Sequence, residues 1–76
     1  MTNWRNHITI DPNICHGKAC IKGTRIPVAI ILANLAAGES SEAVRRTYPV
    51  LKTAAIRASL AYAAELASER VIRLPD

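Results

Sequence analysis

Two cysteines and two histidines near the start of the chain are the side chains best suited to bind a metal: His7, Cys15, His16 and Cys20. Zinc sites usually combine about four ligands, in pairs roughly two to four residues apart. Cys15 and Cys20 have the upper limit of that spacing, and there is no second cysteine pair. We expect no metal or other cofactor, and we expect both thiols to stay reduced as small, half-buried side chains. A metal-responsive regulator remains a minor alternative.

No other group of reactive side chains has the pattern of an enzyme's active site. Gly17-Lys18 is not a phosphate-binding loop, because Pro12 stands where the upstream glycine is required and Ala19 stands where Ser or Thr should follow. The acidic residues are scattered, and neither histidine has a nearby serine or carboxylate partner. We therefore expect a binding protein and not an enzyme.

Basic side chains form the second notable group. The chain has ten Lys and Arg against six Asp and Glu, a net charge of +4, which satisfies a first, weak criterion for a nucleic-acid binder. Four of these cations gather where one helix is expected to give way to the next: Arg45, Arg46, Lys52 and Arg57. Contacts that position a protein on DNA phosphates are normally made at such places.

The start of the last predicted helix adds a possible base-reading face. Thr53, Arg57 and Ala61 share one side of that helix, so a long cationic side chain lies among small ones that permit close approach to base edges. A solvated helix face, with Arg57 reaching toward Glu65, explains the same pattern equally well.

The elements that must position these residues fit one domain over residues 1–76, with a β ribbon at 1–26, a helical bundle at 27–70 and a tail at 71–76. A chain of 76 residues buries only about 60% of its unfolded surface, so dimerisation is an economical source of stability. The first ten residues hold no long apolar run, so we expect no signal peptide, no membrane partner and a cytoplasmic location.

The ribbon is predicted from alternation and turn chemistry. Ile8 to Ile10 alternates as a short strand, which Asp11-Pro12-Asn13 ends. A second strand is predicted to include Cys20 to Lys22, because Gly17 and Gly23, which interrupt regular secondary structure, lie on either side of it.

Three helices are predicted to follow the ribbon. The first runs from Val28 to Ala37, with Pro27 in its first turn and Gly38 as its stop. The second covers roughly Glu42 to Thr47; Ser40 or Ser41 caps it, and Tyr48-Pro49 ends it. The third runs from about Thr53 to Glu69. It has one apolar stripe of Ile56, Leu60, Ala63 and Ala67 and a second side of Ser59, Tyr62 and Leu66. We expect one of these two sides to contact another subunit.

A short second helix and a long third one match the helix-turn-helix plan, in which the third helix enters the DNA major groove. Two antiparallel helices that merely pack together would give the same pattern. The connection from Tyr48 to Lys52 is also longer than the tightest such turns.

A series of short motifs runs from roughly Ile8 to Glu65: Ile8 to Pro12, Gly17-Lys18, Ile21 to Val28, Leu35 to Gly38 with Ser40, Tyr48 to Leu51, Ile56, Ala58 and Tyr62-Ala63. The residues that define these motifs include Asp11, Gly17, Gly23, Thr24, Arg25, Pro27, Tyr48 and Pro49. In these residues the chain resembles a family of short prokaryotic proteins known as domain of unknown function 433. The resemblance implies a homeodomain-like helix-turn-helix behind a β ribbon, usually dimeric. It also implies kinship with VapB-like antitoxins, which silence a PIN-like ribonuclease toxin encoded beside them.

The chain departs from the family pattern at two places. Where members commonly have two glycines and then Lys-Pro, this chain has His16-Gly17-Lys18-Ala19, so we expect a differently shaped turn. Where members open the third helix with a Thr cap and acidic residues, Thr53 is the only cap candidate left, which costs about 1 kcal/mol. The loss of acidic residues also removes repulsion toward phosphate.

Two residues of the motif have physical roles that we can state. Gly23 is expected to adopt a backbone conformation that favours glycine. Arg25 is expected to form a bidentate ion pair with Asp11, with a phosphate contact as the alternative. The sequence as a whole predicts a dimeric antitoxin that contacts its own promoter through Arg45, Arg46, Lys52, Thr53 and Arg57. The alternative is a protein-interaction module that binds a partner enzyme without binding DNA.

Overall fold

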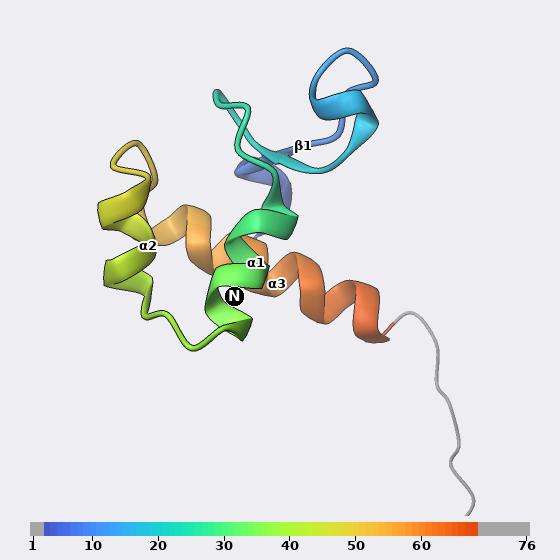
Figure 1. Ribbon diagram of the computed structural model, residues 1–76. Coiled ribbons are helices and arrows are strands. Elements are labelled where there is room, and N and C mark those ends of the chain that lie inside the picture. The colour runs from blue at the N-terminus through green and yellow to red at the C-terminus, as the bar shows by residue number, and fades with distance from the viewer. Residues whose placement is uncertain (1–2, 69–76) are drawn as a thin grey trace, which may run out of the picture.

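The computed structural model describes residues 3–68 (Figure 1). Three α-helices make up about half of it, and a small two-stranded antiparallel sheet precedes them. The elements are the 3-10 turn η1 (Trp4–Asn6), β1 (Ile8–Thr9), the turn η2 (Cys15–Gly17), β2 (Cys20–Ile21), α1 (Val28–Ala36), α2 (Ser41–Thr47) and α3 (Thr53–Ser68). The predicted tail at 71–76, and the last residue predicted for the third helix, lie outside the described residues.

The ribbon is joined to the helical part by hydrogen bonds. Ile8 pairs with Ile21 and Thr9 with Cys20 in the antiparallel ladder. The other edge of β2 meets the start of α1, where the Val28 N–H donates to the Ala19 carbonyl at 2.9 Å. The ribbon and α1 therefore form one continuous backbone network.

Residues at each end set the bounds of α1 and α2, and the observed bounds lie within one residue of the predicted ones. Pro27 precedes α1 in an extended conformation, and Gly38 follows it at a φ of +95°. Ser40, rather than Ser41, caps α2: its hydroxyl oxygen accepts a 3.1 Å hydrogen bond from the Ala43 N–H. The helix ends before Tyr48, whose own N–H still bonds to the Val44 carbonyl.

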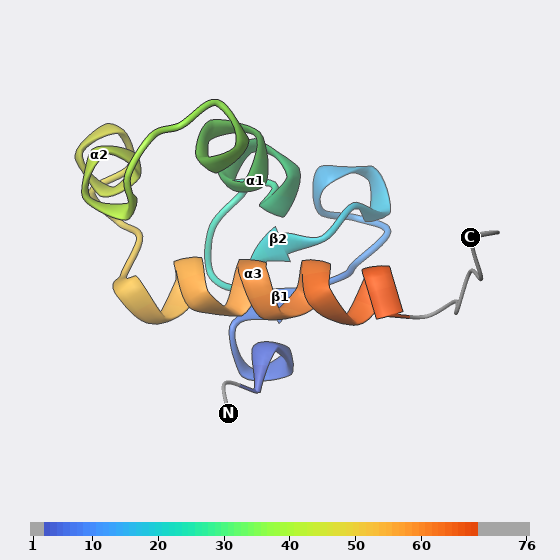
Figure 2. The same ribbon diagram turned by 90° about the horizontal axis from the view of Figure 1, so that it is seen from below.

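Helix α3 lies along one side of the molecule and contacts α1, α2, β1 and η1 (Figure 2). Helices α1 and α2 lie on one side of it, and η1 lies on the other. The side chains that fill the space between the helices are fully buried: Ile31, Val44, Leu51 and Ile56. Burial of such a cluster is the main source of stability for a domain of this size.

The buried face of α3 differs from the apolar stripe predicted for it. Ile56 is in the core, but Leu60 is 49% exposed, and Ser59 is fully buried in its place. The Ser59 hydroxyl donates to the Ala55 carbonyl of its own helix at 3.0 Å, so its burial leaves no unpaired polar group. Because other elements pack on two sides of α3, its buried face is broader than a single stripe, and small residues of the helix such as Ser59 lie in it.

The first described turn of the chain packs against the second half of α3. The Trp4 ring meets the Tyr62 ring edge-to-face, with 4.9 Å between centroids. The carboxylate of Glu65 accepts hydrogen bonds from the indole N–H of Trp4 and, at 3.3 Å, from the guanidinium of Arg5. The two ends of the described chain are thus in contact.

Candidate nucleic-acid interface

The five residues predicted to contact DNA are all exposed and lie along one stretch of the fold. Arg45 and Arg46 are in the last turn of α2, Lys52 is in the connection, and Thr53 and Arg57 are in the first turns of α3. Buried Leu51 anchors this connection between the two helices. The core therefore fixes the backbone beneath the cations and leaves their charged ends in solvent.

The two arginines of α2 do not have equal freedom. The Arg45 side chain donates through Nε to the Leu51 carbonyl at 3.4 Å, which ties it to the connection before α3. Both arginines line a shallow depression together with Glu42 and Pro49. The carboxylate of Glu42 partly offsets their charge, so this end of the surface is less positive than a count of cations suggests.

The exposed face of α3 begins with Thr53 and Arg57 and continues through Leu60 and Ala64 at helical spacing. Among the described residues, the carboxylate expected to attract Arg57 is engaged elsewhere, because Glu65 bonds to Trp4 and Arg5. Within residues 3–68, Arg57 forms no ion pair with Glu65, and the interpretation as a solvated helix face stays a prediction. Arg57 remains a solvent-facing cation beside short side chains.

Lys52 also belongs to a second surface that the sequence did not indicate. It lines a groove between the start of α3 and the tip of the β ribbon, opposite Lys22. Lys22 was predicted only as a strand residue. Its position directly before a turn glycine is the one sequence signal that it stands exposed at the tip.

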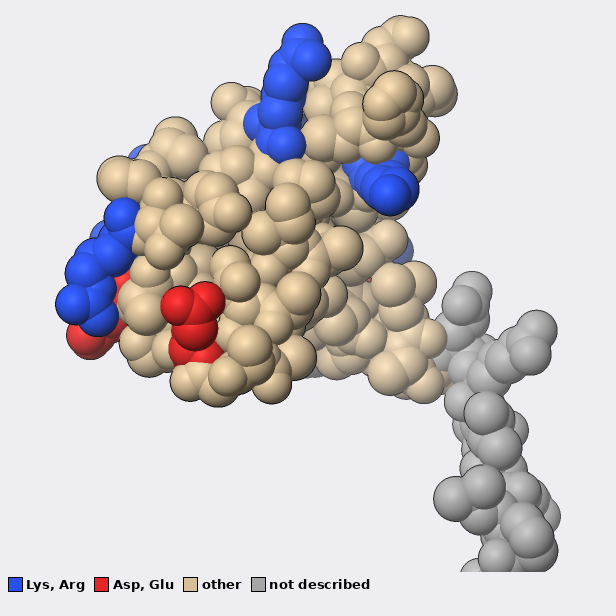
Figure 3. Space-filling view, in the orientation of Figure 1, with Lys and Arg blue, Asp and Glu red and all other residues tan. Residues whose placement is uncertain are grey.

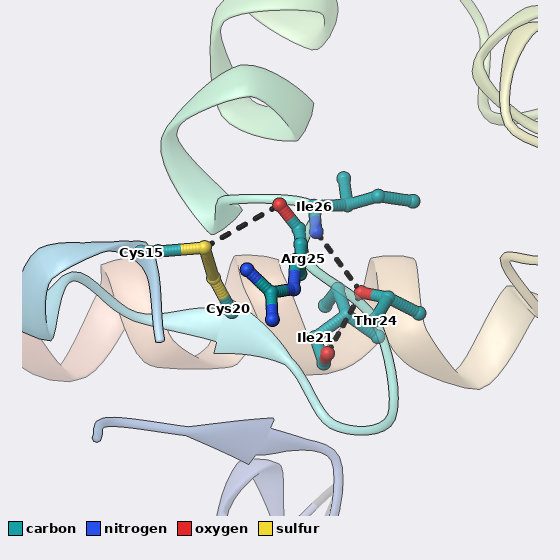
Figure 4. The surroundings of a disulfide bond; sticks show 6 residues. All are labelled: Cys15, Cys20, Ile21, Thr24, Arg25 and Ile26. Carbon is teal, nitrogen blue, oxygen red and sulfur yellow. Dashed lines mark hydrogen bonds between the residues drawn. A yellow bond between two sulfur atoms is a disulfide. The ribbon is translucent and has the colours of Figure 1, made fainter. Parts of the chain in front are cut away.

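The motif at the ribbon tip forms a hydrogen-bonded turn (Figure 4). The Thr24 hydroxyl donates to the Ile21 carbonyl at 2.8 Å and accepts from the Ile26 N–H at 3.1 Å. Gly23 has a φ of +81°, as expected for a residue that reverses the chain. Thr24 is structural, because its hydroxyl both donates and accepts a hydrogen bond within the turn.

The predicted ion pair between Arg25 and Asp11 is not present. One carboxylate oxygen of Asp11 accepts a 2.8 Å hydrogen bond from the Asn13 N–H, which closes a tight turn after β1. Arg25 is exposed, and the ion pair found in residues 3–68 joins Arg5 to Glu65 instead. Local turn chemistry thus occupies the carboxylate that a more distant arginine was expected to use.

The expectation of two reduced thiols is also wrong, because Cys15 and Cys20 form a disulfide (Figure 4). Cys15 and His16 adopt left-handed conformations, with φ of 51° and 55°, and Gly17 follows at 81°. This left-handed turn brings Cys15 back to β2, and its Sγ lies 3.4 Å from the Arg25 carbonyl oxygen. The turn at His16-Gly17, expected to be differently shaped, is therefore a cross-linked one.

The side chains and helices of residues 3–68 also bear on two other kinds of site, a metal centre and a membrane span. No three His, Cys, Asp or Glu side chains there come close enough to share a metal ion. Within the same residues, no helix has the length and apolar character needed to cross a membrane.

The fold is a β ribbon ahead of three helices, and comparisons identify the family. A crystal structure of a DUF433 member protein from Anabaena variabilis ATCC 29413 is similar, with a TM-score of 0.78 and 31% identity over 86% of this chain and 64% of that one. The family model described as "Protein of unknown function (DUF433)" matches residues 8–63. The protein belongs to this family.

A curated relative is similarly close in sequence. The uncharacterized protein y4eO of Sinorhizobium fredii (strain NBRC 101917 / NGR234) is 37% identical over 59 residues. The match covers 78% of this chain but 27% of that relative. The chain therefore corresponds to about a quarter of the longer protein.

Proposed function

We propose that the protein binds double-stranded DNA through α3, with α2 and α3 acting as a homeodomain-like helix-turn-helix. The observation that supports this most directly is the exposed run of cations from Arg45 to Arg57. Buried Leu51 anchors this run, and no carboxylate within residues 3–68 pairs with Arg57. In this arrangement Thr53 and Arg57 meet base edges, while Lys52, Arg45 and Arg46 meet phosphates.

The wider role that we propose is that of a dimeric antitoxin, which represses its own promoter and neutralises a PIN-like ribonuclease toxin. The support for this role is the family resemblance, together with an uncharged face on α1. Ala29, Ile30, Ala33 and Ala36 are exposed on this helix, and Figure 3 shows a broad uncharged area over α1 between the charged margins. Such a surface suits a second subunit or a protein partner.

A titration of a duplex from the protein's own upstream region tests the DNA proposal. If a dimer contacts about six phosphates, affinity falls about a thousandfold between roughly 50 and 200 mM salt. Arg57→Ala is expected to relax sequence preference, whereas Arg25→Ala, the loss of another exposed arginine outside α3, should leave that preference intact. Absent or salt-insensitive binding would overturn the proposal.

The second candidate is a protein-interaction module that binds a partner enzyme without touching DNA, and the apolar face of α1 favours it specifically. Ile30 is 41% exposed there on a helix with no charged residue. Co-purification with the neighbouring gene product, combined with a negative result in the DNA titration, would select this function. Replacing Ile30 with Glu should then abolish the complex and leave the fold intact.

A further inference from the structure

A groove lies between the tip of the β ribbon and the start of α3. Its volume is about 290 Å³. Figure 1 shows the loop after β2 and the loop after α2 rising on the same side of the molecule. The residues that line the groove come from the ribbon, from the connection before α3 and from the first turn of α3: His7, Ile21, Lys22, Gly23, Thr24, Val50, Lys52, Ala54 and Ala55.

The charge of this groove is of one sign. Lys22 on the ribbon side and Lys52 on the helix side are both exposed, and the lining holds no Asp or Glu. Within residues 3–68, neither lysine takes part in an ion pair or a side-chain hydrogen bond. Gly23 and Ala54 add little bulk between them. The groove therefore has an ammonium group on either side, and neither has a partner within residues 3–68.

The backbone that carries Lys22 is well fixed. Its N–H donates to the His7 carbonyl at 2.8 Å, and the next turn is closed by hydrogen bonds from the Thr24 N–H and hydroxyl to the Ile21 carbonyl. Only the lysine side chain itself must be ordered when a ligand binds, so the entropic cost of binding stays low.

We propose that the sugar-phosphate backbone of DNA lies in this groove, with a phosphate held between Lys22 and Lys52. The ribbon is then a second DNA-contacting element beside α3. Lys52 directly precedes Thr53 and is close in sequence to Arg57, so DNA that follows the exposed start of α3 passes the mouth of the groove. This inference rests on the proposed DNA-binding function, and it adds Lys22 to the residues that carry it.

The test is a fluorescence-anisotropy titration of the full chain with a random-sequence DNA duplex over a series of salt concentrations. Each lost phosphate contact lowers the slope of log affinity against log salt by about 0.9. Lys22→Ala is expected to reduce the slope by that amount per protomer, and Lys22→Arg should retain it. The matched control is Lys18→Ala, which removes the same charge from an exposed lysine ahead of β2 and outside the groove.

The outcomes separate this inference from the function on which it rests. If the wild-type chain binds DNA and Lys22→Ala has the same slope as Lys18→Ala, the ribbon contact is wrong and the α3 interface stands. A larger loss of slope in Lys22→Ala than in Lys18→Ala supports the groove. If the wild-type chain binds no duplex even at low salt, both proposals fail together. Circular dichroism of each variant verifies that these exposed substitutions leave the fold unchanged.

Discussion

Replacing His16 with glycine should stabilise the protein. His16 is exposed and has a φ of 55° and a ψ of 36°, in the left-handed region. An L-residue with a β-carbon is disfavoured there by about 1–2 kcal/mol. Glycine removes that penalty, but its freer unfolded chain costs roughly 0.5–1 kcal/mol. The net gain expected for His16→Gly is therefore roughly 0.5–1 kcal/mol, which corresponds to a Tm higher by about 2–8 °C.

Thermal unfolding followed by circular dichroism measures this change, with the disulfide intact in every sample. The matched control is Lys18→Gly, two residues further along at an ordinary φ of −79°, where glycine relieves no strain and should lower the Tm. The two substitutions are thus expected to have opposite signs. If His16→Gly lowers the Tm as much as Lys18→Gly does, the left-handed turn at residues 15–17 is not the strained element described here.

Two other predictions concern stability. Reducing the bond between Cys15 and Cys20, five residues apart, should lower the free energy of unfolding in a urea titration by about 2 kcal/mol. In the control chain with Cys15→Ser and Cys20→Ser, the free energy of unfolding should be the same with and without reductant. Alkylation of both thiols in the absence of reductant would refute the cross-link. Ser40→Ala should cost about 1 kcal/mol because it removes the cap of α2, whereas Ser41→Ala serves as the control and should cost much less.

The helices were predictable because short-range chemistry begins and ends them. Pro27, Gly38, Ser40 and Tyr48-Pro49 each act within a few residues, and the observed bounds differ from the predicted ones by a residue at most where the structure describes them. The side of α3 that faces the core was harder to predict from the sequence. Whether Leu60 or Ser59 enters the core depends on where η1 and α1 pack, which no periodic pattern within α3 contains.

The site shows the same division between local and long-range information. Exposure of Arg57 and Lys52 follows from helix periodicity and turn position. The Asp11 carboxylate was assigned to a distant arginine, yet a neighbouring N–H reaches it at a smaller entropic cost. Lys22 was not predicted as a site residue because only the folded chain places it across a groove from Lys52, which is thirty residues later in the sequence.

The contact of Trp4 with Tyr62 also has a consequence for the order of events during protein synthesis. Because α3 follows η1 by many residues, Trp4 lacks its docking partner Tyr62 until the second half of α3 has been made. The ribbon and α1 are close in sequence and form earlier, since short loops close at a lower entropic cost. Docking of Trp4, the one tryptophan in the sequence, is therefore a late step in forming the described fold, and tryptophan fluorescence can follow that step.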